Sequence, residues 1–132
     1  MQLDPHTDIA SISGTVAKLR NTYNSRITRP LEWRRQQLQN MIKMLEDNEA
    51  ELLDALKEDL GKPTAEGFIT DLAFVTGEIK LMLKNLTKWN STEKVPTPLV
   101  AMPAKSVLIP EPLGVVCVIA PWNYPVQLLL VP

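Results

Sequence analysis

The sequence predicts an α/β protein in which a helical layer comes first and the opening strands of a doubly wound parallel sheet follow. Apolar residues recur at steps of three and four through most of residues 7–89, which is typical of amphipathic helices. Most of the eleven prolines lie after Lys94, which marks a change of architecture. A β-branched apolar run at residues 115–119 then predicts a strand buried on both faces, as in a parallel sheet.

The bulk composition is that of an ordinary globular domain. The 132 residues are 45% hydrophobic and 22% charged, and the formal net charge of -1 predicts no nucleic-acid partner. The single cysteine, Cys117, excludes an internal disulfide and is compatible with a reducing compartment, so we expect a cytoplasmic protein. Neither a secretory signal nor a stretch long enough to span a bilayer is evident.

The first helix is predicted over residues 7–24, with Thr7 or Asp8 as its N-cap. A polar tail that holds His6, the only histidine, precedes the helix, so no metal site is expected there. The apolar stripe of this helix consists of Ile9, Ile12, Val16, Leu19 and Tyr23.

Two further helices are predicted between residues 30 and 60. Pro30 suits the first turn of the second helix, because the N–H that proline lacks has no partner there. Asn48 followed by Glu51 resembles a capping box and predicts the start of a third helix. Gly61 and Pro63 predict its end, since glycine adopts the left-handed cap and proline cannot continue the helix. The predicted buried residues are Leu31, Leu38, Met41, Ile42, Leu45, Leu52, Leu53, Leu56 and Leu60.

The fourth helix, predicted over residues 64–89, has the most regular apolar pattern in the chain. Its stripe alternates steps of four and three, and we interpret it as core packing and not as a ligand-binding face. Charged residues on the helices are interpreted as solvated faces. The stripe consists of Phe68, Leu72, Val75, Ile79, Met82, Leu86 and Trp89.

Proline-rich residues 95–103 are predicted to form an extended linker across the surface, because proline fits neither a helix interior nor a central strand. A polyproline II ligand is the alternative, but no flanking basic residue stands at a useful spacing. A short strand is predicted at residues 106–109, and Gly114 opens the buried strand.

Residues 120–125 follow the predicted buried strand, and ligands of open α/β sheets bind just beyond the carboxyl ends of such strands. This turn combines two prolines, an indole, a carboxamide and a phenol. An apolar segment then begins at Val126, and no second parallel strand follows with which the first could pair. We therefore expect the sequence to be a fragment of a longer chain.

Asn123 is the sharpest candidate for chemistry. Its carboxamide N–H groups donate two hydrogen bonds without carrying charge, so a rigidly held Asn123 could stabilise a developing oxyanion. The alternative is that Asn123 caps the turn or the following helix, and from the residues alone this structural role is preferred. Cys117 lies between Val116 and Val118 and is interpreted as a buried strand residue and not as a nucleophile.

Other site patterns are missing from the sequence. The five glycines are scattered and form no phosphate-binding loop. One histidine leaves no plausible Ser/His/Asp set and no metal-ligand cluster. We therefore predict neither a phosphate cradle nor a metal site in these residues.

Two stretches of the sequence resemble the aldehyde dehydrogenase superfamily. Residues 111–116, Glu-Pro-Leu-Gly-Val-Val, and residues 120–125, Ala-Pro-Trp-Asn-Tyr-Pro, look like a strand and turn of that superfamily. Residues 28–34, Thr-Arg-Pro-Leu-Glu-Trp-Arg, and the helices up to Trp89 resemble the N-terminal part of its class 3 branch, the fatty and aromatic aldehyde dehydrogenases. The resemblance extends from about residue 15 to the end of the chain.

This resemblance implies a division of the chain into three parts. Residues 1–93 form an N-terminal helical segment, and residues 94–113 form the proline-rich linker and a bridging strand. Residues 114–132 form the first strand, the motif turn and the start of a helix of an incomplete Rossmann-like NAD-binding domain. The strand near residues 105–109 resembles part of the bridging sheet through which the family oligomerises, so a homodimer is expected of the full-length protein.

The resemblance also implies the oxidation of an aldehyde to a carboxylic acid, through a cysteine thiohemiacetal and with NAD or NADP as cofactor. Asn123 matches the asparagine that donates its amide to the oxyanion. The backbone of Ala120, Pro121 and Trp122 matches the wall beside the nicotinamide ribose. Tyr124 matches a residue that lines the tunnel for the small-molecule aldehyde.

The reacting half of the family's machinery has no counterpart in this sequence. The nucleophilic cysteine, the general-base glutamate and the glycine-containing cofactor loop lie downstream in the family, and Cys117 does not align with the nucleophile. We therefore predict that residues 1–132 alone neither oxidise aldehydes nor bind NAD tightly. A non-catalytic helical interaction module built on residues 7–89 and another doubly wound oxidoreductase are the alternative hypotheses, which the downstream reading frame would distinguish.

Overall fold

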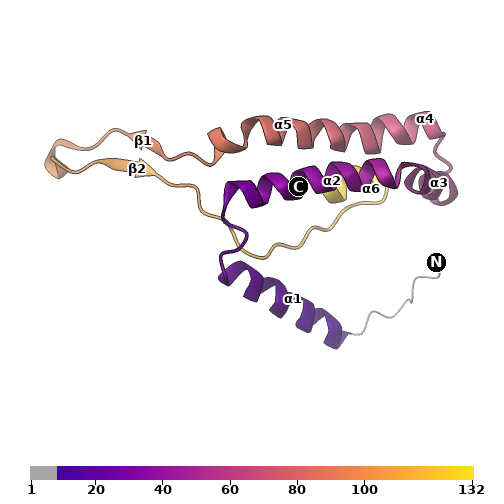
Figure 1. Cartoon of the computed structure of the whole chain (residues 1–132), viewed down its shortest axis with the longest axis horizontal. Coiled ribbons are helices and arrows are strands. Elements are labelled where there is room, and N and C mark those ends of the chain that lie inside the picture. The colour runs from indigo at the N-terminus through magenta and orange to yellow at the C-terminus, as the bar shows by residue number, and fades with distance from the viewer. Residues whose placement is uncertain (1–8) are drawn as a thin grey trace.

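The computed structural model describes residues 9–132, which are mostly helical with one small two-stranded sheet (Figure 1). His6 and the predicted N-cap residues Thr7 and Asp8 lie outside this range. Within it, no helix is both long and apolar enough to cross a membrane. The elements in chain order are α1 (Ile9–Asn24), α2 (Leu31–Asp47), α3 (Glu49–Leu60), α4 (Thr64–Gly67), the π-helical segment η1 (Phe68–Ala73), α5 (Phe74–Trp89), β1 (Glu93–Val95), the 3-10 helix η2 (Leu99–Ala101), β2 (Ser106–Leu108) and α6 (Pro125–Leu130).

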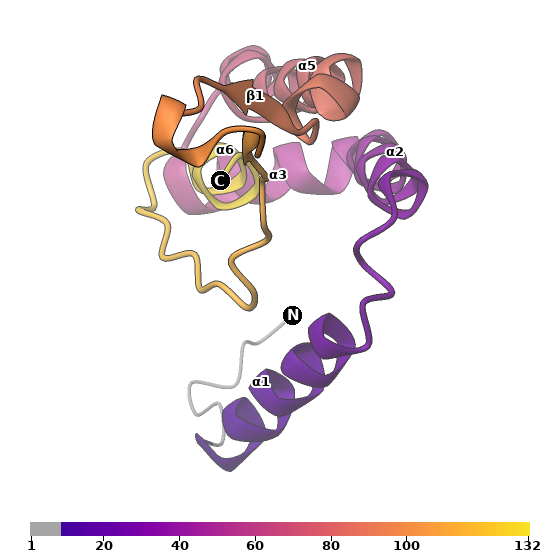
Figure 2. The ribbon, with the colours of Figure 1, turned by 90° about the vertical axis from the view of Figure 1, so that its left-hand side faces the viewer.

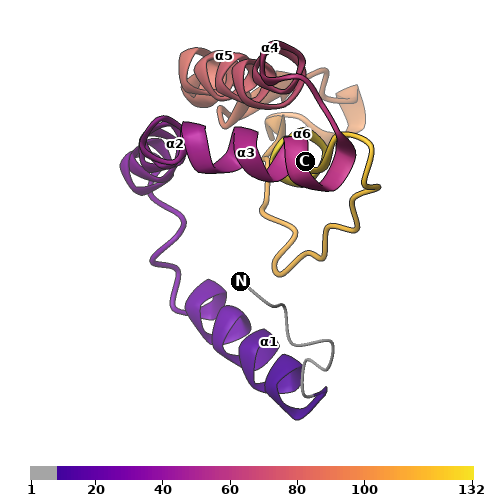
Figure 3. The same cartoon turned by 90° about the vertical axis from the view of Figure 1, so that its right-hand side faces the viewer.

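Two long helical rods lie side by side. One is α2, and the other consists of α4, η1 and α5, which run on into one another (Figure 1). The helix α3 crosses one end of the pair, and α6 packs against η1 and α5 (Figure 3). The first helix, α1, diverges from the others (Figure 2). The hairpin of β1 and β2 projects from the end at which α5 finishes, so α1 and the hairpin lie at the edges of a helical bundle (Figure 1).

The core consists of two small clusters of aliphatic side chains. The first cluster joins α2 to α5, and the second joins α3 to η1. Val126 in the first turn of α6 packs against both clusters, so the last helix covers both of them. Each fully buried side chain of this kind stabilises the fold by about 1.5–3 kcal/mol. The buried members are Leu45, Val75 and Ile79 in the first cluster and Leu53, Leu56 and Leu72 in the second.

The helix ends follow the predicted signals only in part. Gly61 ends α3 in the left-handed conformation, with φ at 67°, as predicted. Pro30 is the N-cap of α2 and lies just before its first turn, not inside it. The capping box predicted at Asn48 is wrong, because the Asn48 side-chain amide donates backward to the carbonyl oxygen of Met44 at 2.7 Å. That bond closes α2 and leaves the start of α3 without a side-chain cap.

The predicted fourth helix has the expected range, but η1 interrupts its α-helical geometry. The wider turn of a π-helix changes which residues face the core. Asp71 and Leu72 are adjacent and both buried, whereas Phe68 is 41% exposed and Trp89 is 53% exposed. The predicted apolar stripe is therefore confirmed at its centre and wrong at its two ends.

The proline-rich region folds as the tip of a hairpin and not as a linker across the surface. The strands pair antiparallel, with Lys94 opposite Val107, and η2 lies in the loop between them. The Thr97 hydroxyl accepts the backbone N–H of Ser106 at 2.9 Å, which helps to close the loop. The sequence predicted β2 but missed β1, because three residues of Glu, Lys and Val lack a recognisable strand pattern.

The strand predicted at residues 115–119 does not form in this chain. The segment runs as an extended trace, and within residues 9–132 only β1 and β2 form a sheet (Figure 1). Ile119 is 91% exposed, and Cys117 is exposed and not buried as predicted. A strand buried on both faces needs neighbouring strands for its hydrogen bonds and its side-chain contacts. The described part of the chain supplies no such neighbour, so it shows none of the predicted doubly wound sheet.

Candidate functional site

The turn at residues 120–125 joins the extended segment to α6. Pro125 is the first residue of α6, where its ring fixes φ at a helical value and its missing N–H costs nothing. This helix start fixes the C-terminal side of the turn. The five predicted site residues lie together on this loop, with Ala120 and Tyr124 half-buried and Pro121, Trp122 and Asn123 exposed.

The Asn123 side chain is exposed and does not cap the helix that follows it. Across residues 9–132 it makes no hydrogen bond, and the N-cap position of α6 belongs to Tyr124, which makes no side-chain cap bond. The interpretation of Asn123 as a helix cap is therefore wrong. Its two N–H donors and its carbonyl oxygen are exposed beside the start of a helix.

A buried carboxylate from a distant part of the chain caps α6 instead. Asp71, in η1, is completely buried, and its Oδ1 accepts the backbone N–H groups of Val126 at 3.2 Å and Gln127 at 3.3 Å. These two N–H groups lie in the first turn of α6, where a helix has no internal partners for them. The negative charge of Asp71 also suits the N-terminal end of the helix dipole.

Lys62 balances the charge of Asp71 and extends the contact to the turn. Its Nζ lies 2.7 Å from Oδ2 of Asp71, and the Lys62 side chain is only 9% exposed. The Thr70 hydroxyl, which donates to the carbonyl oxygen of Glu66 at 2.8 Å, also lies 3.3 Å from the same Asp71 oxygen. The Lys62 ammonium also lies 4.1 Å from the ring centroid of Tyr124, which is a cation–π distance. Lys62 therefore contacts both the capping carboxylate and the residue that follows Asn123.

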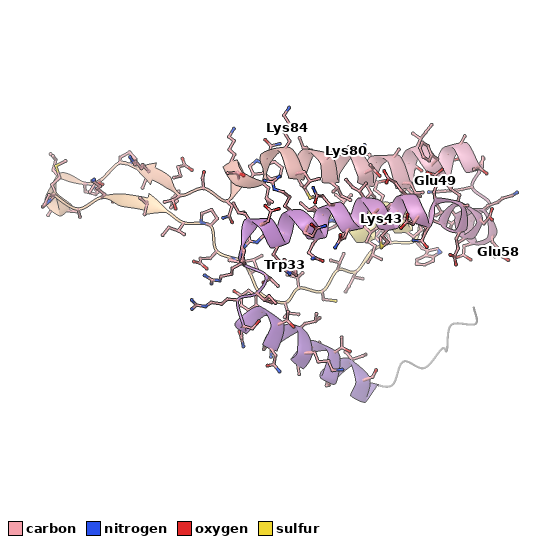
Figure 4. All side chains as sticks on the ribbon, viewed as in Figure 1. Trp33, Lys43, Glu49, Glu58, Lys80 and Lys84 are labelled. Carbon is pink, nitrogen blue, oxygen red and sulfur yellow. The ribbon has the colours of Figure 1, made fainter. Side chains whose placement is uncertain are left out.

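The N-terminal end of the extended segment is anchored separately. The Tyr23 hydroxyl donates to the carbonyl oxygen of Pro112 at 2.9 Å, and Arg29 pairs with Glu111 at 3.0 Å. Trp33 lies at the start of α2, on the side where the segment passes (Figure 4). The segment is thus held near residue 112 by α1 and its following loop, and near residue 126 by Asp71.

Between these anchors, the backbone of residues 113–123 is unpaired. Within residues 9–132, none of its N–H or C=O groups makes a hydrogen bond. Backbone groups of this kind are available to a neighbouring strand or to a polar ligand. An apolar groove of about 250 Å³ lies next to the turn, between Trp122 and Leu129 on one side and Met44 and Leu52 on the other. Among residues 9–132 as a whole, no group of three acidic, histidine or cysteine side chains could hold a metal ion.

Asp71 and Lys62 were both missed from the sequence, although each had a signal. Asp71 lies four residues before Val75 on a predicted helix, so it falls on the face that the apolar stripe buries. An acid on a buried face requires a partner. Lys62 stands between Gly61 and Pro63, which were interpreted only as a helix stop.

The pKa of Lys43 is shifted, but this residue lies away from the turn at residues 120–125. The hydrogen bond from Lys43 to Asp47, together with the attraction between their charges, raises the pKa of Lys43 above its ordinary value of 10.5. Both residues are on the exposed face of α2, where Lys43 projects (Figure 4). The shift therefore has no bearing on the turn.

The sequence profile and the curated relatives that match this chain all belong to one family. Residues 5–131 match the sequence profile of the "Aldehyde dehydrogenase family". Aldehyde dehydrogenase family 3 member H1 of Arabidopsis thaliana is 40% identical over 123 residues, which are 93% of this chain and 25% of that protein. Aldehyde dehydrogenase family 3 member B1 of Homo sapiens is 40% identical over 121 residues, which are 92% of this chain and 26% of that protein.

A solved structure is also similar to this chain. The substrate-bound state of Staphylococcus aureus AldH superposes with a TM-score of 0.87 and 35% sequence identity. The match covers 90% of this chain and 26% of that one. The chain thus spans about a quarter of the length of the relatives it matches.

Proposed function

The chain belongs to the aldehyde dehydrogenase family, and from this premise we propose that its turn at residues 120–125 supplies the oxyanion donor of an NAD- or NADP-dependent aldehyde dehydrogenase. The donor is the Asn123 carboxamide. The observation that carries this proposal is that the carboxamide is exposed and free of partners within residues 9–132, on a loop that both α6 and the Asp71 cap hold in place. A donor of this kind can act only if it is not already used by the fold.

The proposed role of Asn123 requires only an N–H donor that faces the aldehyde oxygen. When a nucleophile adds to an aldehyde carbonyl, the carbonyl oxygen gains negative charge. An N–H group aimed at that oxygen stabilises the transition state more than the neutral aldehyde, which lowers the barrier without tightening substrate binding equally. In the proposed reaction the nucleophile is a cysteine thiolate, and the product after hydride loss and hydrolysis is a carboxylic acid. Those reacting groups belong to parts of the family's sequence that residues 1–132 do not include.

The residues present fit one edge of a nicotinamide cofactor. The family typically uses NAD or NADP, which would accept hydride from the aldehyde carbon. In this chain, the backbone of Ala120, Pro121 and Trp122 carries unpaired polar groups that suit the hydroxyl groups of a ribose. The half-buried Tyr124 and the apolar groove beside Trp122 suit the wall of an aldehyde tunnel. These residues would orient the ligands but would not hold the phosphates.

A chimera tests the proposal. In it, this chain replaces the matching quarter of Staphylococcus aureus AldH, and NADH formation with an aldehyde is followed. We expect the unaltered chimera to be active. We expect Asn123→Ala to lower kcat by about 10²–10³, or ~2.7–4 kcal/mol of transition-state stabilisation, with a smaller change in KM. Asn123→Asp keeps the shape of the side chain and removes its N–H donors, so it should lose at least as much.

The matched control for this test is Asn40→Ala, which removes an exposed carboxamide from α2 and should leave kcat unchanged. An unaltered chimera that is folded but makes no NADH would contradict the proposed function. An Asn123→Ala variant with full kcat would contradict the role given to that residue.

A further inference from the structure

The ion pair of Lys62 and Asp71 has no part in the reaction proposed above, yet it touches the turn that carries Asn123. We propose that Asp71, held by Lys62, is a positioning residue: by capping α6 it fixes the turn at residues 120–125, and so fixes the direction of the Asn123 carboxamide. The catalytic half of this inference rests on the proposed function, and the structural half does not.

The two oxygens of the Asp71 carboxylate are shared between two parts of the chain. Oδ2 accepts the Lys62 ammonium at 2.7 Å, and Oδ1 accepts the N–H groups of Val126 and Gln127 at 3.2 and 3.3 Å. No buried side-chain nitrogen or oxygen in the described range lacks a partner. A buried ion pair that only stabilised the helical layer would not need to direct one oxygen at another element. This carboxylate therefore links the helical layer to α6.

The link has a large effect because α6 has little stability of its own. It contains six residues, fewer than a helix needs to be stable alone in water. The segment before it makes no backbone hydrogen bond from residue 113 to residue 123 within the described chain. The start of α6 is therefore fixed by the Asp71 cap and by the apolar contact of Val126 with the core. Asn123 precedes Val126 by only three residues, so the cap acts close to it.

Lys62 adds a second contact on the same side of the turn. Its ammonium lies 4.1 Å from the ring centroid of Tyr124, the residue directly after Asn123. One cation therefore orients both the capping carboxylate and the neighbouring ring. The left-handed Gly61 and the following Pro63 flank Lys62 and fix the backbone from which it reaches inward.

Amide hydrogen exchange of the full 132-residue chain, followed by NMR, tests the cap directly. First-turn amides of a helix normally exchange freely because they have no internal acceptor. We expect the amides of Val126 and Gln127 to be protected relative to those of Trp122 and Asn123. Exchange of all four amides at the unprotected rate would overturn the proposal without any variant being made.

Two double variants separate the cap from the ion pair. Lys62→Met with Asp71→Asn and Lys62→Met with Asp71→Leu both remove the two charges, and only the first retains an acceptor oxygen at position 71. In the variant that combines Lys62→Met with Asp71→Leu, we expect the Val126 and Gln127 amides to exchange about tenfold faster or more than in the original chain. The Asp71→Asn pair should keep most of the protection. The matched control, Lys57→Met with Asp54→Asn on the exposed face of α3, should change neither amide.

The exchange of core amides at Val75 and Ile79 tells a local effect from a global one. If these amides accelerate by the same factor as Val126 and Gln127, the pair is only a stabiliser of the whole fold and the proposal is overturned. A selective loss of protection in α6 supports it.

The effect of the cap on catalysis is measured as kcat and KM in the chimera with Staphylococcus aureus AldH. We expect the Asp71→Leu pair to lower kcat more than it changes KM, because a misdirected Asn123 loses contact mainly with the transition state. The Asp71→Asn pair should restore most of kcat. If the cap is present in the exchange experiment but kcat is the same in both pairs, the positioning role is wrong. An inactive unaltered chimera would instead count against the proposed function and leave the exchange result to decide the cap.

Discussion

At the residue scale, Gly61 controls how Lys62 reaches the site. Gly61 has a φ of 67°, which a residue with a side chain adopts only with strain. This conformation ends α3 and turns the chain so that Lys62 enters the bundle, and Pro63 is the N-cap of α4. The left-handed conformation of Gly61 therefore determines where the Lys62 ammonium, which pairs with Asp71, is placed.

We expect Gly61→Ala to lower the free energy of unfolding by about 1–2 kcal/mol, the cost of the left-handed conformation for a residue with a Cβ. Space is not the reason, because an added Cβ at this position would meet no atom within 4 Å. Gly77 inside α5 is the matched control. Its Cβ would also meet nothing within 4 Å, and Gly77→Ala should stabilise the helix by about 0.5–1 kcal/mol. Urea unfolding measures both, and equal effects would contradict the argument.

Asn123 and Asp71 show what the sequence can and cannot reveal about single residues. The sequence indicates Asn123 because its carboxamide follows a predicted buried strand, beyond whose carboxyl end ligands bind in open α/β sheets. Its freedom from capping could not be predicted, since the actual cap comes from 55 residues away in sequence. Such a pairing leaves no local pattern. Asp71 was overlooked because a single acid in a helical stripe is hard to tell from the solvated face beside it.

At the element scale, α1 is connected to the rest of the chain by few contacts. It diverges from the bundle, and its last turn reaches the extended segment through Tyr23 and the carbonyl oxygen of Pro112 (Figure 2). The Tyr23 ring also lies 3.9 Å from the position that a Cβ would take on Gly114, whose φ is 105°. Tyr23 thus joins two elements that are far apart in sequence.

We expect Tyr23→Phe to lower the free energy of unfolding by about 0.5–1.5 kcal/mol, because the substitution deletes one partly buried hydrogen bond and keeps the ring. Thr22→Val is the control, since the Thr22 hydroxyl bonds only to the carbonyl oxygen of Lys18 on the exposed face of the same helix. Its effect should stay within about 0.5 kcal/mol. Urea unfolding is again the measurement, and a Tyr23→Phe protein as stable as the original would show that the link has no net value.

The helices were predicted well from the sequence, whereas β2 alone of the strands was predicted correctly. Periodic apolar residues determine a helix locally, so the ranges of α2, α3 and the α4–α5 rod agreed with prediction to within a residue or two. A strand depends on partners elsewhere in the chain. For this reason β1 was missed, and residues 115–119 were predicted as a buried strand although nothing described here pairs with them.

At the scale of the whole molecule, apolar side chains remain exposed on the hairpin and on the extended segment. Val100 and Leu113 are each 94% exposed, and Ile119 is 91% exposed. The chain spans about a quarter of the length of its relatives, so three quarters of their sequence has no counterpart in residues 1–132. Exposed apolar side chains of this kind are available to segments that the relatives have and residues 1–132 do not.

We expect the purified 132-residue chain to form no NADH from NAD and an aldehyde above the background rate. The proposed donor Asn123 is present, but the sole thiol, Cys117, is not the residue expected from the resemblance to act as nucleophile. A spectrophotometric assay of NADH and a titration with NAD check both halves of this expectation, and the chimera described above serves as the positive control. Robust NADH production by the isolated chain would show that it contains a complete site.

The Asp71 cap also has a consequence for the order in which the protein is made. Asp71 leaves the ribosome's catalytic centre 55 residues before Val126, which at about 5–20 residues per second is several seconds earlier. The acceptor for the first turn of α6 is therefore synthesised before the helix that needs it. During translation, the finished helical layer can serve as a template on which the nascent turn with Asn123 takes its shape as it emerges.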